Sequence, residues 1–251
     1  MLEESHDGGI LTLRLVRPPV NALNGALLDR LQAAVEAAPG RGMRGVLLTG
    51  TRGRFSAGLD VPELLALDRA GIGAFWRSFL GCLSSMAASP IPLVAAINGH
   101  SPAGGAVLAL YCDRRVMARG DYRIGLNEVQ VGLYPGPTIY RVLERVVGPR
   151  HAAALLPAGA LLTPEEAVAV GFVDELAAPE EVEPRSRAWL ASVLALPPLA
   201  YARTRALARA DLIELMRTLT ERDFEIMTDS WFRDETQATL RALVARFKRA
   251  P

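Results

Sequence analysis

Short apolar runs alternate with longer stretches of helical period over about the first 180 residues, and this alternation constrains the fold more than any other feature. Residues 10–16 place leucines at alternate positions, as in a half-buried strand. Residues 46–48 and 93–97 are short apolar runs bounded by Gly or Pro, as in buried strands. Apolar side chains recur at helical spacing in residues 25–38 and 75–86. Because strands alternate with helices, the sequence predicts an α/β fold with a parallel or mixed sheet.

The last part of the chain has a different pattern, because strand signals disappear after about residue 180. Shortly before this point Thr163 begins a strong helix start, in which Glu166 can bond back to the cap. Residues 182–250 are helical in period. We therefore expect an α/β core over residues 1–180 and an all-helical region over residues 181–251.

Charge and hydropathy exclude several classes of protein. The chain has 28 basic and 27 acidic residues, whereas a nucleic-acid or anionic-membrane binder needs a basic excess to displace counterions from phosphates. No apolar run reaches the roughly 18 residues that a membrane span requires. Residues 1–5 are acidic and polar, unlike a signal or transit peptide. We predict a cytoplasmic protein that binds neither nucleic acid nor membrane.

The cysteine and histidine residues do not form a pattern typical of metal or redox sites. Cys82 and Cys112 each lie inside an apolar stretch, which is typical of buried free thiols. His6, His100 and His151 are scattered along the chain and lack the spacing of metal ligands. We therefore expect no disulfide framework and no metal site.

Three segments have compositions that packing alone does not explain. In residues 55–60, small side chains would let a ligand approach the main chain, so that a backbone N–H can point outward. Residues 98–106 turn through Pro102 into an apolar helix, and its glycine-rich entry exposes unpaired N–H donors at a positive dipole end. Residues 124–133 set Glu128 alone among apolar residues, where desolvation would raise its pKa toward the range useful for acid/base chemistry.

Each segment also has a plainer interpretation. A glycine-rich turn is commonly only a turn, and a lone glutamate between apolar residues is commonly a solvated surface residue. A serine hydrolase is disfavoured, because the glycines around Ser56 are one residue too far apart for a nucleophile elbow. The three segments together favour a site where developing negative charge meets a carboxylate.

The order and spacing of these segments resemble those of the crotonase family. The stretches that carry the resemblance are residues 17–24 (RPPVNALN), 55–60 (FSAGLD), 98–106 (NGHSPAGGA), 125–132 (GLNEVQVG) and 167–174 (AVAVGFVD). The resemblance covers roughly residues 8–180 and extends more loosely into the helical tail. It implies a four-turn ββα spiral core and a C-terminal helical trimerisation region. It also implies a homotrimer or dimer of trimers that binds an acyl-CoA thioester.

The resemblance further implies roles for single residues. The backbone N–H groups of Leu59 and Gly104 would form an oxyanion hole, and Glu128 matches the second of the family's two catalytic glutamates. The first of these glutamates falls on Val107, the main departure from the family's pattern. The residues assigned to the substrate and CoA site are Ser56 and Ala57, whose backbone would lie along adenine and pantetheine, with Gly58, Asp60, Gly105, Val107 and Arg17. Asp60 fits a helix start better than a catalytic role.

Val107 favours isomerisation over hydration. Enoyl-CoA hydratases hold a water molecule between two glutamates, and a valine removes one of these hydrogen-bond partners. Shifting a double bond from the 3- to the 2-position needs no water, and one carboxylate can carry the proton from C2 to C4. In motif the chain is most similar to the mitochondrial-type delta-3,delta-2-enoyl-CoA isomerases. We predict an enoyl-CoA isomerase without a cofactor, because coenzyme A is part of the substrate.

Other interpretations stay open at this point. The same site could serve weak hydration or another acyl-CoA reaction, such as hydrolysis or decarboxylation. Dehalogenation ranks lowest, because no nucleophilic Asp is evident beside the oxyanion hole. A non-catalytic acyl-CoA-binding subunit is the alternative from a different class. The sequence does not indicate the acyl-chain length, nor a pathway such as fatty-acid oxidation or aromatic degradation.

Further residues are candidates for supporting roles. The candidate walls of an acyl pocket, all of which could equally be core residues, are Phe75, Trp76, Tyr134 and Tyr140. The apolar side chains expected to mediate subunit association are Trp231, Phe232, Leu240, Leu243 and Phe247. Besides Arg17, the candidate contacts of the CoA phosphates are Arg246 and Lys248.

Overall fold

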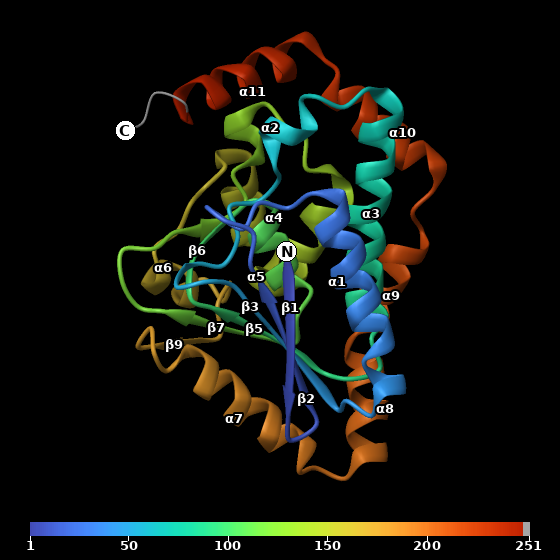
Figure 1. Ribbon diagram of the computed structural model, residues 1–251, viewed down its shortest axis with the longest axis vertical. Coiled ribbons are helices and arrows are strands. Elements are labelled where there is room, and N and C mark those ends of the chain that lie inside the picture. The colour runs from blue at the N-terminus through green and yellow to red at the C-terminus, as the bar shows by residue number, and fades with distance from the viewer. Residues whose placement is uncertain (248–251) are drawn as a thin grey trace.

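The computed structural model describes residues 1–247, and its larger sheet has six strands in the order β1-β2-β3-β5-β7-β9 (Figure 1). These strands are β1 (Leu2–Asp7), β2 (Ile10–Leu15), β3 (Gly45–Thr49), β5 (Leu93–Ile97), β7 (Arg114–Ala118) and β9 (Glu175–Ala177). β1 and β2 pair antiparallel, and every other neighbouring pair is parallel. The predicted α/β class with a mixed sheet is therefore confirmed.

A smaller sheet pairs three short parallel strands, β4 (Gly53–Arg54), β6 (Gly99–Pro102) and β8 (Ile124–Gly125). Each of them follows a strand of the larger sheet in the chain, and helices come next. α2 (Val61–Leu64) and then α3 (Arg69–Ala88) follow β4, and α4 (Gly104–Leu110) follows β6. The chain thus winds as a repeated strand-strand-helix spiral. The three segments singled out in the sequence lie at or just beyond the small-sheet strands.

The inner strands of the larger sheet are covered on both faces. The first, third and fifth residues of β5 belong to the main core, whereas the second and fourth belong to a separate apolar cluster. Alternate side chains of a strand point to opposite faces, so a strand covered on both sides is apolar at every position. This explains why the predicted strands at 46–48 and 93–97 appear as continuous apolar runs.

Helices from distant parts of the chain cover these two faces. α1 (Gly25–Ala37) and α3 pack on the main core, and α7 (Val182–Leu194) packs on the opposite face against β3, β5 and β7 (Figure 1). Asn24 caps α1, where its side-chain oxygen accepts from the Leu27 N–H at 3.0 Å. α7 packs as a layer against one face of the sheet. The helical region expected over residues 181–251 therefore begins as part of the core. The division of the chain at residue 180 stays a prediction about domain organisation.

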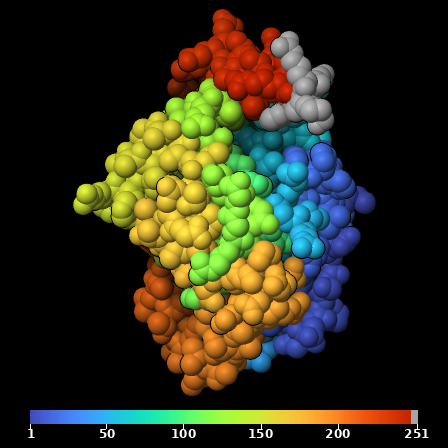
Figure 2. Space-filling view, turned by 90° about the vertical axis from the view of Figure 1, so that its left-hand side faces the viewer, coloured from blue at the N-terminus to red at the C-terminus, as the bar shows by residue number. Residues whose placement is uncertain are grey.

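The other helices complete the spiral and then return over it. They are α5 (Gly136–Ala158), α6 (Pro164–Ala169), α8 (Pro198–Ala208), α9 (Ala210–Arg217), α10 (Glu221–Trp231) and α11 (Asp234–Phe247), with the 3₁₀ helices η1 (Pro39–Arg41) and η2 (Glu128–Val131). Thr163 and Glu166 form the predicted capping box of α6. α9 and α10 pack on α3, and α11 contacts η2 and α2 at the end of the molecule that is red in Figure 2. Within residues 1–247, no helix is long and apolar enough to cross a membrane.

The prediction that Trp231 and Leu240 mediate subunit association is wrong. Trp231 is 1% exposed and Leu240 is 0% exposed, so both side chains are already buried inside the chain. The Trp231 ring packs edge-on against an indole of α3, with the ring centroids 6.2 Å apart. Phe232 and Leu243 are partly buried, and the side chain of Phe247 lies outside the described residues.

Candidate active site

The first candidate oxyanion segment follows β4 and is held by buried hydrogen bonds. The Ser56 hydroxyl donates to the Asn21 carbonyl oxygen at 2.7 Å and accepts from the Gly58 N–H at 3.2 Å. Gly58 has a φ of +83°, a left-handed value that favours glycine. The next N–H, that of Leu59, donates to no acceptor among residues 1–247. This turn therefore leaves one backbone donor free.

The second candidate segment runs from β6 into α4. Ala103 precedes the helix with φ +47° and ψ −124°, a strained conformation for a residue with a side chain. Its N–H donates to the Gly125 carbonyl oxygen at 2.8 Å. Gly104 is the first residue of α4, where N–H groups have no intrahelical acceptor. The Gly104 N–H also has no other acceptor in the described chain, so a second donor is free at the positive end of the helix.

The two segments touch each other, which places the free donors side by side. A Cβ built on Gly58 would lie 3.1 Å from the Gly104 nitrogen. A Cβ built on Gly104 would lie 3.3 Å from Leu59 Cδ2. Side chains at these glycines would crowd the neighbouring segment. The N–H groups of Leu59 and Gly104 are thus arranged to receive an oxygen that gains negative charge.

Glu128 is the first residue of η2, which is separated from the end of β8 by two residues, and it is 9% exposed. Burial in apolar surroundings raises the pKa of Glu128 to about 7. Its Oε2 atom is buried and has no hydrogen-bond partner among residues 1–247. A carboxyl group with this pKa gains and loses a proton near neutral pH, as a general acid/base must.

Four of the predicted site residues line one cavity, namely Leu59, Gly104, Val107 and Glu128. Val107 lies on α4 three residues after Gly104 and is 1% exposed. The rest of the wall is largely apolar and consists of Trp76, Phe79, Leu133, Tyr134, Pro135, Ile139 and Met227. Glu128 is the only carboxylate among the described residues of this lining. The cavity therefore combines two backbone donors, one carboxyl group and apolar walls.

Ser56 and Gly105, also assigned to the substrate site, pack against each other behind the cavity. A Cβ built on Gly105 would lie 2.6 Å from the Ser56 carbonyl oxygen, so this glycine allows α4 to approach the first segment. The Ser56 side chain is 0% exposed. Ala57 is exposed, and its N–H donates to the Val20 carbonyl oxygen at 2.9 Å. Contacts of the Ser56 and Ala57 main chain with CoA stay a prediction.

Arg17 and Asp60 form an ion pair beside the first segment. Asp60 caps α2 by accepting from the Glu63 N–H at 3.0 Å, which confirms its expected role at a helix start. Arg17 also donates to a Glu63 carboxylate oxygen at 2.7 Å. Contacts of Arg17 and Asp60 with CoA stay predictions. Arg246 is exposed, and Lys248 lies outside the described residues.

Two of the four aromatic residues proposed as walls of an acyl pocket line the cavity. Trp76 and Tyr134 line the cavity, whereas Phe75 is 3% exposed in the core and Tyr140 packs against the core. The two cysteines are buried free thiols, as predicted.

Asn21 and Met227 contribute to the site, although the sequence had assigned neither a role. Asn21 is 1% exposed, and its side-chain amide donates to the carbonyl oxygens of Arg54 and Phe55 at 3.1 and 3.2 Å. It thereby fixes the strand that leads into the first oxyanion segment. Met227 reaches the cavity from α10. Asn21 lies within a stretch that carries the family resemblance, but no local pattern marks Met227.

Comparison with known proteins agrees with this geometry. A family model described as Enoyl-CoA hydratase/isomerase matches residues 5–248. The chain belongs to this family. It is 34% identical to the human protein "Enoyl-CoA delta isomerase 1, mitochondrial" over 99% of this chain and 83% of that protein. It is 36% identical to "Probable enoyl-CoA hydratase echA17" of Mycobacterium avium over 80% of this chain and 79% of that protein.

The solved structures of this family agree on the fold. The chain matches "Crystal structure of human mitochondrial delta3-delta2-enoyl-CoA isomerase" with a TM-score of 0.94 and 32% identity, over 99% of this chain and 98% of that chain. The predicted crotonase-like fold is confirmed, and the chain is an enzyme of the crotonase superfamily. Its relatives include both isomerases and hydratases by name, so family membership alone does not select the reaction.

Proposed function

We propose that this enzyme is an enoyl-CoA isomerase that moves the double bond of a 3-enoyl-CoA thioester to the trans-2 position. The observation that carries the proposal is the pair Val107 and Glu128 in one cavity, with Glu128 the only carboxylate among its described lining residues. Hydration would need a second polar group to hold the attacking water, and Val107 offers none. A double-bond shift needs one base and no water.

In this proposal the thioester carbonyl oxygen accepts hydrogen bonds from the N–H groups of Leu59 and Gly104. Negative charge grows on this oxygen as C2 loses its proton. The two donors therefore stabilise the transition state and the dienolate more than they stabilise the substrate. Removal of one oxyanion-hole donor costs about 3 kcal/mol of transition-state stabilisation where it has been measured in an enzyme that transfers acyl groups.

Glu128 would carry out both proton transfers. Its carboxylate takes the C2 proton, the C–H electron pair becomes a C1–C2 π bond, and the carbonyl π pair moves onto the oxygen. In the second step this oxygen pair restores the carbonyl, the C1–C2 π pair forms the new C2–C3 double bond, and the C3–C4 π pair takes the proton from Glu128 at C4. The carboxylate is regenerated, so no external acid is consumed. A pKa of about 7 suits both steps.

The apolar walls support the same reaction. Trp76, Phe79 and Met227 come from helices α3 and α10 and surround the cavity that contains Glu128. Side chains of this kind favour the acyl chain over water. A site that excludes water also strengthens the hydrogen bonds to the dienolate oxygen.

The direct test of Glu128 is the substitution Glu128→Gln, assayed with 3-enoyl-CoA by formation of the conjugated trans-2 thioester. We expect kcat to fall by about 10²–10⁴-fold, because the general acid/base is lost. The affinity for a saturated acyl-CoA, measured by calorimetry, should change little. Glu165→Gln is the matched control, because the Glu165 side chain is 61% exposed and lies outside the cavity.

Three outcomes would reject parts of this proposal. Full isomerase activity of Glu128→Gln would remove Glu128 from the mechanism. Faster hydration of trans-2-enoyl-CoA than isomerisation of 3-enoyl-CoA by the wild-type enzyme would favour the hydratase alternative. Binding of CoA esters without turnover of either substrate would favour a non-catalytic subunit.

We further propose a homotrimer or dimer of trimers in the cytoplasm, with CoA lying along the main chain of Ser56 and Ala57. The name of the human relative places that protein in the mitochondrion, so cell fractionation is the test of location. The proposed reaction uses no resident cofactor, because CoA arrives as part of the substrate.

A further inference from the structure

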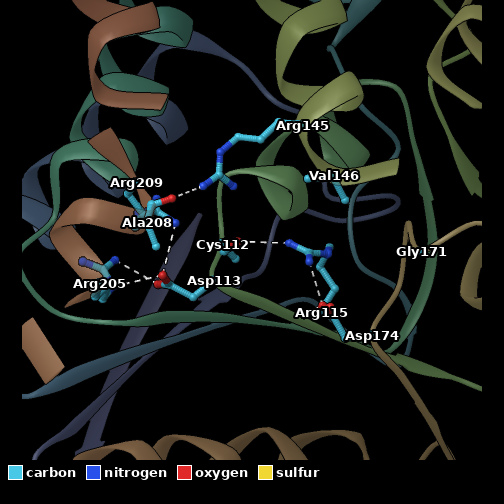
Figure 3. A pocket seen from close by; sticks show the side chains of 10 residues that line it. All are labelled: Cys112, Asp113, Arg115, Arg145, Val146, Gly171, Asp174, Arg205, Ala208 and Arg209. Atoms are coloured by element: carbon cyan, nitrogen blue, oxygen red, sulfur yellow. Dashed lines mark hydrogen bonds and ion pairs between the residues drawn. The ribbon is translucent and has the colours of Figure 1, made fainter. Parts of the chain in front are cut away.

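A second cavity, of about 280 Å³, lies at the opposite end of α4 from Gly104. It is bounded by the residues that lead into β7, by α5 and by the junction of α8 and α9 (Figure 3). α4 has seven residues, so its length separates the two sites by about 10 Å. The volume suits a small hydrated solute, since a water molecule takes roughly 30 Å³ of liquid volume. The proposed isomerisation assigns no role to this cavity.

Positively charged side chains outnumber negatively charged ones in the lining of this cavity. Its charged lining consists of four arginines and two aspartates, namely Arg115, Arg145, Arg205, Arg209, Asp113 and Asp174. Asp174 pairs with Arg115 at 2.8 Å. Arg145 pairs at 2.8 Å with Asp211, a residue outside the lining whose side chain is 63% exposed. Two arginines therefore remain for the single carboxylate of Asp113.

Asp113 is shared by two buried guanidinium groups. Arg205 donates to both of its oxygens at 2.9 Å, and Arg209 donates to one of them at 3.2 Å. The side chains of Arg205 and Arg209 are only 8% and 5% exposed. A buried charge without a counter-charge is costly, because little solvent is available to screen it. Both groups also donate to backbone carbonyl oxygens, which carry no formal charge, namely those of Met86, Ala87, Ser89 and Tyr111. The floor of the cavity thus carries one formal positive charge in excess.

The cavity also contains a guanidinium N–H group that no atom of residues 1–247 accepts. Arg145 donates through Nε to Asp211 and through Nη2 to the Ala208 carbonyl oxygen, whereas its Nη1 has no acceptor among residues 1–247. The Arg145 side chain is 31% exposed, so this group is accessible to a solute. Figure 3 shows Arg145 above Asp113, and Arg115 to the right of Asp113 beyond Cys112. Excess charge and a free planar donor coincide in one concave site.

We propose that this cavity is a binding site for a small oxyanion of the phosphate class. Arginine is well suited to such a ligand, because its planar guanidinium can donate parallel hydrogen bonds to two oxygens of one anion. Arg205 and Arg209 share the single negative charge of Asp113, and the anion would supply a second negative charge. The ligand is either free phosphate or the phosphate end of a larger molecule. The competing interpretation is that the arginines only fasten α8 and α9 to the core.

The experiment is thermal unfolding and calorimetric titration of the full chain with inorganic phosphate, against sodium chloride at equal ionic strength. Anions that bind the folded state raise Tm, and we expect a rise of about 3–6 °C at ten times Kd. Arg145→Gln should weaken phosphate binding by tenfold or more. Asp211→Asn is the matched control, because it removes the same ion pair but keeps the guanidinium, and it should bind phosphate at least as well as wild type.

Two further variants complete the test. Arg141→Gln, at an exposed position of α5 whose side chain is 62% exposed, should leave binding unchanged. Ala208→Glu brings a carboxylate to the exposed rim of the cavity and should abolish the response to phosphate. A separate titration with 3′-AMP distinguishes the two sources, since tighter binding of 3′-AMP than of phosphate indicates a larger ligand. The proposal is overturned if neither ligand exceeds the chloride effect, or if Arg145→Gln binds as wild type does.

Discussion

At the scale of single residues, Glu128 determines how the proposed reaction depends on pH. Burial raises the pKa of Glu128 to about 7, and the carboxylate must be ionised to take the C2 proton. We expect kcat/KM for 3-enoyl-CoA to rise about tenfold per pH unit below pH 7 and to level off above it. The measurement is a pH–rate profile from pH 5 to pH 9. A profile that is flat between pH 5 and pH 7 would contradict the assignment.

The same raised pKa predicts an effect on stability. A carboxyl group with a higher pKa in the folded state than in the unfolded state destabilises the fold increasingly as the pH rises from the unfolded-state pKa to the folded-state pKa, and by a constant amount above the latter. Relative to the ordinary value of 4.5, the shift to about 7 corresponds to about 3 kcal/mol at pH 8. Glu128→Gln should therefore be more stable than wild type at pH 8.

Urea unfolding at pH 8 and pH 4.5 checks this prediction. The gain in stability from Glu128→Gln should shrink to well under 1 kcal/mol at pH 4.5, because the wild-type carboxyl group is then protonated in the folded state and about half protonated in the unfolded state. Glu165→Gln is the exposed control. An equal stability change for Glu128→Gln at both pH values would show that burial of the ionised group is not costly.

At the scale of elements, the contact between α4 and the first oxyanion segment holds the two backbone donors in place. A Cβ on Gly105 would lie 2.6 Å from the Ser56 carbonyl oxygen, and a main-chain atom cannot rotate away as a side chain can. We expect Gly105→Ala to destabilise the fold by about 1–3 kcal/mol and to lower kcat, because the N–H groups of Leu59 and Gly104 would separate.

Thermal unfolding and the isomerase assay check this prediction. Gly40→Ala is the matched control, since nothing lies within 4 Å of a Cβ built there. If Gly105→Ala retained wild-type Tm and kcat, the close contact would not be needed for the oxyanion hole.

Much of the fold could be predicted because burial leaves a strong periodic signal. The central strands β3 and β5 are covered on both faces, and the capping box at Thr163 is a local hydrogen-bond pattern. The strands of the small sheet could not be found in this way. β4 and β8 have two residues each, too few for a period, and their pairing depends on segments distant in the chain.

The site residues could be predicted where a close main-chain contact or a catalytic group allows only one type of residue at a position. Gly58 and Gly104 are recognisable because the two segments approach too closely for side chains, and Glu128 because it is a lone carboxylate in apolar surroundings. Trp231 was misassigned because an apolar residue of a helical tail looks the same whether it meets its own core or another subunit. Met227 could not be assigned, because only the return of α10 over α3 brings it to the cavity.

At the scale of the whole molecule, exposed apolar side chains on α8 fit the proposed subunit association. Leu199 and Leu207 are 64% and 79% exposed, and residues eight apart lie on one face of a helix. We expect light scattering at micromolar concentration to give three or six times the monomer mass. The double substitution Leu199→Glu and Leu207→Glu should lower that mass if this face lies in the interface. A wild-type monomer would contradict the proposed assembly.

We propose that the single carboxylate of Glu128 beside Val107 makes this enzyme an isomerase. The most direct measurement compares the wild-type kcat/KM for cis-3- and trans-3-enoyl-CoA with that for hydration of trans-2-enoyl-CoA, over several chain lengths. We expect isomerisation of at least one 3-enoyl substrate to be faster than hydration by 100-fold or more, about 2.7 kcal/mol in transition-state free energy. Hydration as fast as isomerisation would contradict it, because Val107 would then not prevent the use of water.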